Sequence, residues 1–514
     1  MGFSEERDMT HVPTIPEYYK GKSIFITGGS GFIGKIVIEK LLYSCTDLDR
    51  IYLLMRPKKS VSPDKRLAQL YSTPCFDRLR KEKPGVFQSK VLVVPGDVME
   101  DGLGLSDEDR KLLAERVNIV FHIAASVRFD DPLKYAVRLN LNGTKEVVEL
   151  ARSMHNLSSF VHVSTSYSNT NREVIEEVMY PPHADWRDTL EICEKLDEHT
   201  LRVMTPKYLG ELPNTYTFSK QLAEHAVYEQ RGQLPAVIVR PSIVIASADE
   251  PISGWIENFN GPVGIFVACG KGIMRTLYTK PDIVSDYIPV DICAKNIIVA
   301  AWARGTKPLE SSDDVEIYNC CSGELNQINI QDLIEMAKEV GASVPLNDAL
   351  WTIGGSITTS EKLYYIRVLV QHLLPAIFVD IVLRIFGKKP MLFKIQRRIY
   401  IANLALRYYI TKQWTFENKN FLALRSKLLE QDKKQFYYLL EGRDKKDYFL
   451  KCCIGGRRYL MKERDEDIPK AKLRFQRMMV LDKTVQVIFY GLLLWWSIKI
   501  FNYYFGIYCN FFVA

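Results

Sequence analysis

The sequence predicts an α/β protein: a doubly wound parallel Rossmann-type sheet, a helical C-terminal domain and a C-terminal transmembrane helix. Short apolar runs alternate with amphipathic stretches, as in a parallel sheet that helices cover on both faces. A glycine-rich loop follows the first run, and one late apolar segment is long enough to cross a bilayer. The expected strands are 22–27, 51–55, 91–94, 118–124, 159–164 and 236–240.

Composition narrows the classes of function. With 514 residues, of which 47% are apolar, the chain can bury one large domain and a smaller unit. The ten cysteines form no C-x-x-C pair and the eight histidines show no ligand spacing, so a disulfide framework and a metal centre lack support. The net charge of +7 is modest and gives no support for nucleic-acid binding.

The loop after the first strand predicts a dinucleotide site. It opens a helix, since apolar residues recur at helical spacing after it. In such a loop the first glycine permits the turn, the second lets the pyrophosphate approach the backbone, and the third lets helix and strand pack closely. The helix N-terminus then binds the phosphates. The expected contacts are Thr27, Gly28, Gly31, Phe32, Ile33 and Gly34.

The second strand is followed by cations. An NAD site would place an acidic residue there for the ribose 2′-hydroxyl, whereas this chain has Arg56, Lys58 and Lys59. Cations suit a 2′-phosphate, so the sequence predicts NADPH as the cofactor. A solvated basic loop is the alternative. Further cofactor contacts are expected at the ends of the third and fourth strands, from Asp97, Val98, Ala124 and Ala125.

Tyr216 and Lys220 are expected to carry the chemistry. Their i, i+4 spacing places them on one face of a helix. A nearby ammonium stabilises a phenolate and lowers the pKa of the phenol, so that the oxygen can exchange a proton with a carbonyl as hydride arrives. Lys220 is also a candidate for holding the ribose hydroxyls of the cofactor. The mid-strand His122 and His162 are expected to be core histidines.

The glycine loop, the Tyr-x-x-x-Lys pair and Ser164-Thr165-Ser166 after the fifth strand together resemble the extended short-chain dehydrogenase/reductase family. The resemblance covers about residues 20–300. It implies that Thr165, or alternatively Ser164, hydrogen-bonds the substrate carbonyl, and that Asn140 serves structure and proton relay. One departure is the 51 residues that separate Thr165 from Tyr216, because a charged insertion lies between Asn171 and Asn214 and is expected to shape one wall of a binding cleft.

Further motifs narrow the resemblance. They are Val127-Arg128-Phe129, His162-Val163-Ser164-Thr165, Arg240-Pro241-Ser242-Ile243, Gly254-Trp255-Ile256-Glu257-Asn258-Phe259-Asn260-Gly261-Pro262 and Gly270-Lys271-Gly272. With these motifs the chain resembles the alcohol-forming fatty acyl-CoA reductases over nearly its whole length. The resemblance implies NADPH-dependent reduction of a long-chain fatty acyl-CoA to a primary alcohol through an aldehyde, with release of CoA.

Two other classes of protein stay open. One is a membrane-bound reductase or epimerase of the same fold that acts on a sterol or a nucleotide sugar, although such chemistry has no need of the helical C-terminal part. The other is a membrane-tethered protein that binds NADPH as a structural ligand, which would be expected to lack the Tyr216–Lys220 pair. A cysteine nucleophile is a competing chemistry, but no cysteine lies in the matched catalytic segments.

The expected domains are 1–345 for the reductase with its substrate-binding insertions, 346–470 for the helical part and 484–508 for a membrane anchor. Between residues 485 and 508 Lys499 is the only charge, and basic residues precede this segment, so the positive-inside bias places the body in the cytosol. A buried or interfacial hairpin is the alternative. The family's members lie on peroxisomes or the endoplasmic reticulum, and the uncharged end favours the latter. The oligomeric state stays open.

Two more segments carry expectations. The apolar run 373–386 contains Asp380 and Arg384 and is short for a membrane span, so a buried helix is the favoured interpretation, with a membrane-facing or acyl-binding helix as the alternative. The glycine-rich and aromatic segment 254–276 is expected to have irregular backbone beside a ligand.

Overall fold

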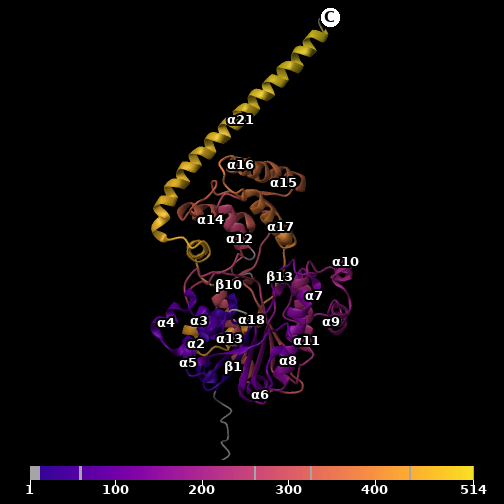
Figure 1. Cartoon of the computed structure of the whole chain (residues 1–514), viewed down its shortest axis with the longest axis vertical. Helices are drawn as coiled ribbons and strands as arrows, with labels where there is room; N and C mark the ends of the chain where they lie inside the picture. Colours follow the sequence, from indigo (N-terminus) through magenta and orange to yellow (C-terminus); the bar gives the residue numbers. More distant parts are fainter. Residues whose placement is uncertain (1–11, 57–60, 260–261, 324–326, 439–440, 513–514) are drawn as a thin grey trace, which may run out of the picture. The chain divides into compact units, whose positions relative to one another are not determined.

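The computed structural model describes residues 12–56, 61–259, 262–323, 327–438 and 441–512 (Figure 1). Contacts divide the chain into two compact units. Unit 1 comprises Met1–Asn258, Asp282–Ile330 and Leu404–Gly455, and unit 2 comprises Phe259–Pro281, Gln331–Asn403 and Gly456–Ala514. The units interleave along the chain, whereas the sequence-based domains are contiguous. The domain boundaries at 345, 470 and 484–508 stay predictions.

The core of unit 1 is a parallel sheet. Its described strands follow the order β11-β7-β5-β4-β1-β2-β3, and every neighbouring pair is parallel. These strands are β1 (Ser23–Thr27), β2 (Ile51–Met55), β3 (Val91–Pro95), β4 (Val117–His122), β5 (Ser159–Val163), β7 (Ala236–Pro241) and β11 (Glu316–Cys320). The six strands expected from the sequence and the doubly wound fold class are confirmed, and β11 is an additional edge strand.

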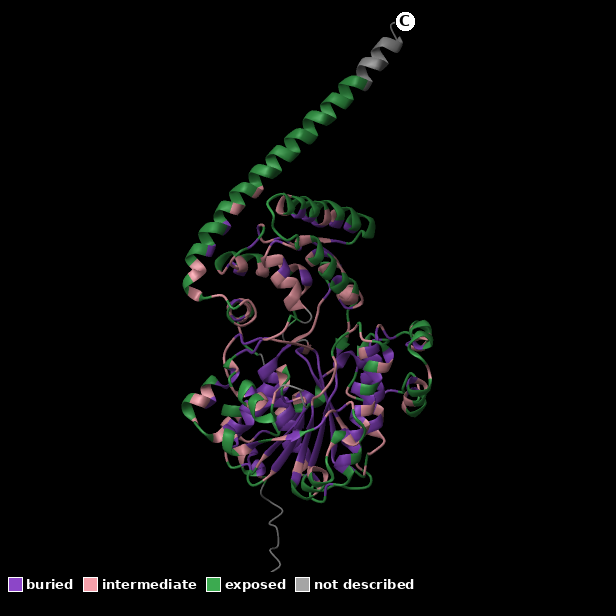
Figure 2. Ribbon diagram, viewed as in Figure 1, coloured by how far each residue is buried: buried purple, intermediate pink, exposed green. Residues whose placement is uncertain are grey.

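Burial explains why these runs are strands of a covered sheet. Every residue of β1, β2, β5 and β7 is buried, because helices lie over both faces, whereas the edge strand β3 exposes Leu92. Figure 2 shows this buried sheet in purple beneath its helices. The order of the strands reverses between β1 and β4, and in such sheets ligands bind at the carboxyl ends of the strands beside this point.

The helices of unit 1 connect and cover the sheet. α2 (Phe32–Ser44) and α13 (Val290–Gly305) pack on each other, and α8 (Gly143–Arg152) packs with α11 (Thr215–Tyr228). The others are α1 (Ile15–Tyr19), α3 (Pro63–Tyr71), α4 (Asp77–Glu82), α5 (Val86–Lys90), α6 (Asp107–Arg116), α7 (Leu133–Ala136), α18 (Lys419–Ser426), α19 (Glu430–Phe436) and α20 (Lys445–Gly455). The short strands β8 (Ile243–Ile245) and β10 (Tyr287–Pro289) pair with each other.

The insertion between residues 171 and 214 forms part of unit 1. It contains β6 (Val174–Ile175), α9 (Trp186–Lys195) and α10 (Glu198–Tyr208). Side chains of α9 and α10, such as Cys193 and Leu201, share an apolar cluster with Phe218 of α11. β6 pairs with β13 (Thr415–Phe416), which lies about 240 residues later in the chain. The insertion is therefore fastened both to the helix of the Tyr-x-x-x-Lys pair and to the later segment of unit 1.

Unit 2 is mainly helical. It contains α12 (Pro262–Gly270), β9 (Thr276–Tyr278), α14 (Ile330–Ser343), β12 (Ser356–Thr358), α15 (Glu361–Val368), α16 (Leu374–Ile385), most of α17 (Leu392–Ile410) and α21 (Ile468–Phe512). The helical C-terminal part is therefore confirmed. The expectation of irregular backbone over 254–276 is wrong for residues 262–270, because this apolar stretch forms α12.

Two described helices are long and apolar enough to cross a membrane: Glu361–Ile385 and Asp465–Tyr503. The second includes most of α21, which is one continuous helix, so the hairpin considered for this segment is wrong. None of the residues in its apolar window is buried, and Figure 2 shows α21 in green along most of its length. The buried-helix interpretation of 373–386 is also wrong, since Phe378 and Ile385 are 67% and 74% exposed.

Candidate active site

The glycine loop lies between β1 and α2, at the point where the strand order reverses. Gly28 has φ +73°, and a Cβ there would lie 2.5 Å from the backbone nitrogen of Ala124 at the end of β4. A Cβ on Gly34 would lie 2.5 Å from the Cα of Gly29. Both glycines are therefore required for close packing of backbone on backbone, which is the role that the dinucleotide-binding loop assigns to them.

Thr27 supports this loop from below. It is fully buried, its hydroxyl lies 2.7 Å from Nδ1 of His122, and the backbone N–H of Ala124 donates to the same hydroxyl at 3.3 Å. Nε2 of His122 lies 2.9 Å from the Thr144 hydroxyl. The interpretation of His122 as a core histidine is thus supported, and burial, reinforced by the charge of Lys220, lowers its pKa to about 3.

The N-terminus of α2 is suited to an anionic ligand. Gly31 is the N-cap and brings no side chain to the first amides of the helix. Such amides have no partner within the helix, and a phosphate is a natural acceptor for them. Phe32, in the first turn, packs against the buried indole of Trp255 with ring centroids 5.0 Å apart. The loop therefore fits a dinucleotide pyrophosphate, and Phe32, Ile33 and the glycines stay predicted contacts.

Arg56 and Asp97 lie together at the ends of β2 and β3. Nε of Arg56 is 2.7 Å from the Asp97 carboxylate, and the Arg56 side chain is 53% exposed. The same carboxylate accepts from the backbone N–H of Met99 at 3.1 Å. Val98 is buried in the core of the sheet unit. Lys58 lies outside the described residues, so only Arg56 of the predicted cations is placed.

Asn140 ties two parts of the site together. It lies in a π-helical stretch, Val137–Asn142, between α7 and α8. Its amide nitrogen donates to the hydroxyl of Ser219 on α11 at 3.0 Å, and its amide oxygen accepts from the N–H of Ser126 at 2.8 Å. Asn140 thereby fixes the loop after β4, which contains the half-buried Ala124 and Ala125, against the helix of the predicted catalytic pair.

The predicted catalytic pair lies in the first turns of α11. Asn214 caps this helix by accepting from the N–H of Thr217 at 3.0 Å. The Lys220 ammonium donates to the Val163 carbonyl at 2.8 Å and lies 3.2 Å from Nε2 of His162, both on β5. The Tyr216 hydroxyl is hydrogen-bonded to the side chain of Thr165. The structure therefore brings Thr165, Tyr216 and Lys220 together, although 51 residues separate the first two.

The pKa of Tyr216 differs from the sequence-based expectation. Burial raises it to about 12, while the hydrogen bond with Thr165 acts in the opposite direction. The lowering expected from Lys220 is therefore wrong for this state of the protein, because desolvation of the phenolate dominates. Burial also lowers the pKa of Lys220 to about 7, against the effect of Glu224. Tyr216 is a neutral phenol at neutral pH.

Ser164 and Thr165 differ in how their hydroxyls are used. Thr165 accepts from the N–H of Tyr167 at 3.2 Å, in addition to its contact with Tyr216. The Ser164 hydroxyl is buried and has no hydrogen-bond partner among the described residues. A buried polar group without a partner is costly, so this hydroxyl is available to a ligand at the end of β5.

Local sequence patterns did not reveal an aromatic wall beside Tyr216. Phe129 lies between two tyrosines, with ring centroids 5.9 Å from Tyr216 and 5.0 Å from Tyr409. The Tyr409 hydroxyl accepts from the side-chain amide of Asn214 at 2.8 Å. Tyr409 comes from the end of α17, so the C-terminal part of unit 1 completes the surroundings of the predicted catalytic helix.

A buried ion pair holds α11 on the sheet. Glu224 and Arg240 are each at most 1% exposed, and they form two hydrogen bonds of 2.9 and 2.7 Å. The Ser168 hydroxyl adds a third contact to Glu224 at 3.2 Å. Breaking one partner of such a pair leaves an uncompensated buried charge, so the pair fixes the position of the helix that carries Tyr216 and Lys220.

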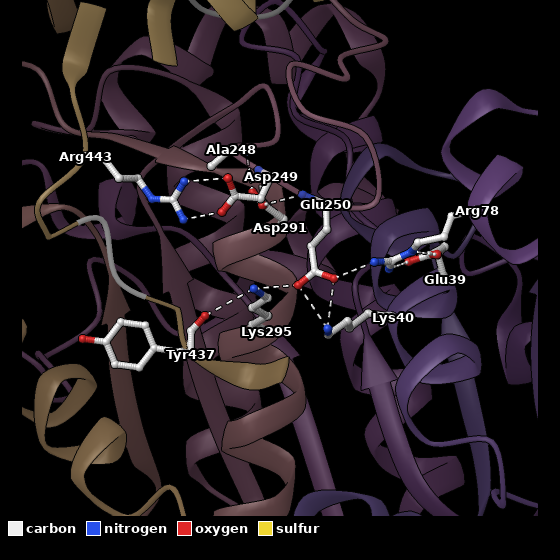
Figure 3. A network of polar contacts seen from close by, with 10 residues as sticks. All are labelled: Glu39, Lys40, Arg78, Ala248, Asp249, Glu250, Asp291, Lys295, Tyr437 and Arg443. Carbon is white, nitrogen blue, oxygen red and sulfur yellow. Dashed lines mark hydrogen bonds and ion pairs between the residues drawn. The ribbon is translucent and has the colours of Figure 1, made fainter. Parts of the chain in front are cut away.

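A larger polar network holds the segment that follows β8 (Figure 3). Glu250 is at its centre and contacts Lys40, Arg78 and Lys295 at 3.0, 2.9 and 2.6 Å. Burial opposes ionisation of Glu250, but the lysines outweigh it and lower its pKa to about 2. The side chain of Asp291 accepts from three successive backbone amides, those of Ala248, Asp249 and Glu250.

The residues five to seven positions after Glu250 contact α2. There Trp255 packs on Phe32, and Glu257 forms an ion pair of 2.5 Å with Lys35 on α2. The network therefore anchors the segment that touches the first turns of α2. Trp255 and Glu257 belong to the motif at residues 254–262, but sequence spacing did not predict their contacts with α2.

The fold and the site together indicate a class of enzyme. A doubly wound sheet with a phosphate-binding glycine loop and a phenol–ammonium pair at the end of β5 is typical of reductases that use a nicotinamide cofactor. Two family models described as male sterility protein match the chain, an NAD-binding model over residues 26–297 and a model named Sterile over residues 371–463. The chain belongs to the fatty acyl-CoA reductase family, because it is 36–38% identical over 90% of its length to proteins of that name.

Named relatives support this assignment, and solved structures share the fold. The chain is 37% identical to fatty acyl-CoA reductase 1 of Gallus gallus and 36% identical to that of Homo sapiens, over 90% of each chain. It is 36% identical to fatty acyl-CoA reductase wat of Drosophila melanogaster over 93% of this chain and 92% of the relative. The fold is similar to the terminal reductase domain of a myxalamid biosynthetic pathway, with a TM-score of 0.58, 17% identity and coverage of 85% and 90%. The fold is also similar to a reductase domain of a Mycobacterium tuberculosis nonribosomal peptide synthetase. The TM-score is 0.57 at 18% identity, with coverage of 87% of this chain and 94% of that chain.

Proposed function

We propose that this protein reduces a long-chain fatty acyl-CoA to the primary alcohol through an aldehyde, with NADPH as reductant and release of CoA. The observation that carries the proposal is the arrangement of Tyr216, hydrogen-bonded to Thr165 and placed one turn before Lys220. The relatives named above as fatty acyl-CoA reductases support the substrate class. When bound, the reduced nicotinamide supplies hydride to the carbonyl carbon.

The protein's own groups stabilise the oxygen of that carbonyl. In the first reduction the thioester oxygen gains negative charge, and the hydroxyls of Tyr216 and Thr165 donate hydrogen bonds to it before the thiolate leaves. In the second reduction the aldehyde oxygen needs a proton, which Tyr216 donates. A phenol whose pKa is near 12 is fully protonated at neutral pH, which suits donation. The unpartnered Ser164 hydroxyl is the alternative donor beside Thr165.

The groups proposed to hold the cofactor surround the carboxyl ends of β1 to β5. The glycine loop and the first turn of α2 bind the pyrophosphate, and Asp97 with Val98 lies at the adenine. Ala124 and Ala125 leave room across the end of β4, Asn140 supports them, and Lys220 contacts the ribose hydroxyls. The Arg56 guanidinium, with Lys58, binds the 2′-phosphate.

Product analysis tests the proposed reaction. The purified full-length protein is incubated with NADPH and acyl-CoAs of increasing chain length, and aldehyde, alcohol and free CoA are measured. We expect one alcohol and one CoA for every two NADPH consumed, with longer chains preferred. Conversion of a sterol or a nucleotide sugar in place of acyl-CoA would identify the rival reductase or epimerase. NADPH binding without any turnover would identify a binding protein.

A substitution at Arg56 tests the choice of NADPH over NADH. A charge-assisted hydrogen bond contributes about 1.5–3 kcal/mol, so Arg56→Ala is expected to raise the KM for NADPH by about 10- to 150-fold. The KM for NADH should change little, because NADH lacks the phosphate. The matched control is Arg152→Ala, which removes an exposed arginine from the end of α8, before the amino end of β5, whereas Arg56 follows the carboxyl end of β2. An equal loss for both cofactors would contradict the assignment.

The pKa of Lys220 makes a second test. The amine is charged below about pH 7 and neutral above it. Only the ammonium attracts the electron-rich ribose and phosphates, so cofactor affinity should fall as the pH rises through 7. The measurement is the Kd for NADH, followed by protein fluorescence from pH 5.5 to 9. NADH is preferred as the ligand because the 2′-phosphate of NADPH itself titrates at about 6. A Kd that is independent of pH would remove Lys220 from the cofactor site.

We further propose that α21 anchors the protein as a single membrane pass, with the reductase facing the cytosol. The length of the exposed apolar window and the basic residues that precede it support this orientation. The endoplasmic reticulum is favoured over the peroxisome. Fractionation of cells that express the full chain, with protease protection of its two ends, tests both points.

A further inference from the structure

In the helical segment 361–385 of unit 2, polar side chains are buried and most of the apolar side chains are exposed. α15, a π-helical turn (Leu369–Leu373) and α16 run on directly from one another. The buried positions recur every four residues and form one narrow stripe. Their side chains are Tyr364, Val368, His372, Ala376 and Asp380. Two of the five are polar, whereas a helix of a water-soluble protein buries its apolar face.

The two polar residues of this stripe fix the orientation of the helix. Nε2 of His372 accepts from the backbone N–H of Arg275 at 2.9 Å. Asp380 accepts from the backbone amides of Met391, Leu392 and Phe393, each at 2.9 Å, and so caps the start of α17. These bonds satisfy the polar groups within unit 2 and leave the opposite side of the helix outward.

The outward side is almost entirely apolar. Between Val368 and Leu383 the only charged side chain is that of Asp380, which is buried. The exposed residues include Leu369, Val370, Leu374, Ile377, Phe378, Val379, Ile381, Ile385 and Phe386. We call this set of residues the α16 face. A contiguous apolar surface of this kind is rare on a soluble protein and marks a site of contact.

The residues on either side of the segment are fastened close together, which argues against a membrane crossing. The strand before it, β12, pairs with β9 (Thr276–Tyr278). After it, the side chain of Gln396 in α17 donates to the carbonyl of Ile273 at 2.8 Å. Both ends are therefore fastened to the stretch 273–278, which is far shorter than the ~30 Å of a hydrocarbon core. The segment therefore begins and ends beside the same short stretch of unit 2.

Charge around the α16 face favours one kind of partner. Exposed cations follow it directly, namely Lys388, Lys389, Lys394, Arg397 and Arg398. An apolar helix face with basic residues at its border is typical of helices that lie in the interface of an anionic membrane. Unit 2 also carries α21, whose apolar window is wholly exposed. A protein partner would more often require a mixed surface with a polar rim.

We infer that the α16 face is a second membrane contact, which inserts into one leaflet as an interfacial helix while the bordering cations meet anionic headgroups. The inference extends the membrane association proposed for α21, but it does not require that α21 spans the bilayer. The segment thus belongs to neither of the two simpler categories, a buried helix or a membrane span.

Photocrosslinking tests the inference on the full-length protein in vesicles of phosphatidylcholine and phosphatidylserine. Phe378 is replaced by the photoreactive p-benzoylphenylalanine, and adducts are identified by mass spectrometry. The matched control carries the same group at Val203 on α10, which is 68% exposed against 67% for Phe378 but lies between His199 and Lys207 on its helix face. A third protein carries it at Leu493 on α21 and reports on the anchor separately.

The inference predicts adducts with lipid acyl chains at position 378 and none above background at position 203. Adducts at 378 without adducts at 493 would support the α16 face and refute the anchor. Adducts at 493 alone would refute the α16 face and leave the anchor. Crosslinks from 378 to a second copy of the chain, in place of lipid, would also overturn the inference. Because Phe378 is exposed, its replacement leaves the core of unit 2 intact.

Discussion

Replacement of Tyr216 by phenylalanine is expected to lower kcat for alcohol formation by about 10²- to 10⁴-fold, which is the usual contribution of a positioned proton donor. The ring keeps its place beside Phe129, and only the hydroxyl that contacts Thr165 is lost. The Kd for NADPH should therefore stay nearly constant. Single-turnover formation of aldehyde and alcohol, together with NADPH binding by fluorescence, measures the two effects separately.

Tyr19→Phe is the matched control for this variant. It removes the hydroxyl of another buried tyrosine, which donates to the backbone carbonyl of Ile298 at 2.9 Å. Its expected effect is a loss of about 1 kcal/mol of stability with kcat preserved. If Tyr216→Phe retained near-normal turnover, the proton would have to come from another group, and the assignment of Tyr216 would fail.

The second large effect is expected at Gly34. A Cβ at this position would lie 2.5 Å from Gly29 Cα and still closer to the carbonyl oxygen of Gly28, so the turn or α2 must move. Overpacking of this kind costs about 1–3 kcal/mol. Because the displaced atoms belong to the phosphate-binding turn, Gly34→Ala should raise the Kd for NADPH by at least about tenfold, equivalent to 1.4 kcal/mol. Fluorescence titration gives this Kd, and thermal unfolding gives the loss of stability.

Gly456→Ala supplies the comparison for Gly34→Ala. Gly456 begins a helical turn in unit 2 and has no positive φ, and beyond its chain neighbours and its own helix no atom lies within 4 Å of the Cβ that alanine would add. Cofactor binding by this variant should match that of the unsubstituted protein. Equal Kd values for NADPH in the two variants would show that the turn at residues 28–34 does not bind the pyrophosphate.

Patterns within single elements were sufficient to predict the sheet and the principal site. The apolar strands, the glycines that open α2 and the i, i+4 pair on α11 depend on neighbours within a few residues, where period and propensity decide the structure. For the same reason β11 was missed, since its sequence Glu316–Cys320 contains polar residues and stands at the edge of the sheet. Its pairing with β7 depends on tertiary contacts that the local sequence does not reveal.

Contacts between distant segments were not predictable from spacing. The pair Glu224–Arg240, the approach of Tyr409 to Phe129 and the network at Glu250 each join elements that the fold alone brings together. The sign of the Tyr216 pKa shift was wrong for a related reason. Spacing indicates that a cation is near, but it does not report the burial of the phenol, which decides the outcome.

The helical segment 361–385 shows a further limit of sequence patterns. Hydrophobicity alone indicated that 373–386 avoids water, and a protein core and a lipid leaflet satisfy that condition equally. The hydrogen bonds of His372 and Asp380 distinguish a core helix from a lipid-facing one, because they show that these polar side chains face unit 2.

The interleaving of the units has a consequence for the way the protein is made. The backbone N–H of Ile15, the first residue of α1, donates to the Asp432 carboxylate, 417 residues later, and β6 pairs with the later strand β13. A ribosome adds about 5–20 residues per second, so the emerging reductase unit spends tens of seconds with these edges uncovered. During that time the unit 2 segments Phe259–Pro281 and Gln331–Asn403 are synthesised before residues 404–455 complete unit 1. Chaperones that act on the nascent chain would therefore meet a unit 1 that still lacks residues 404–455.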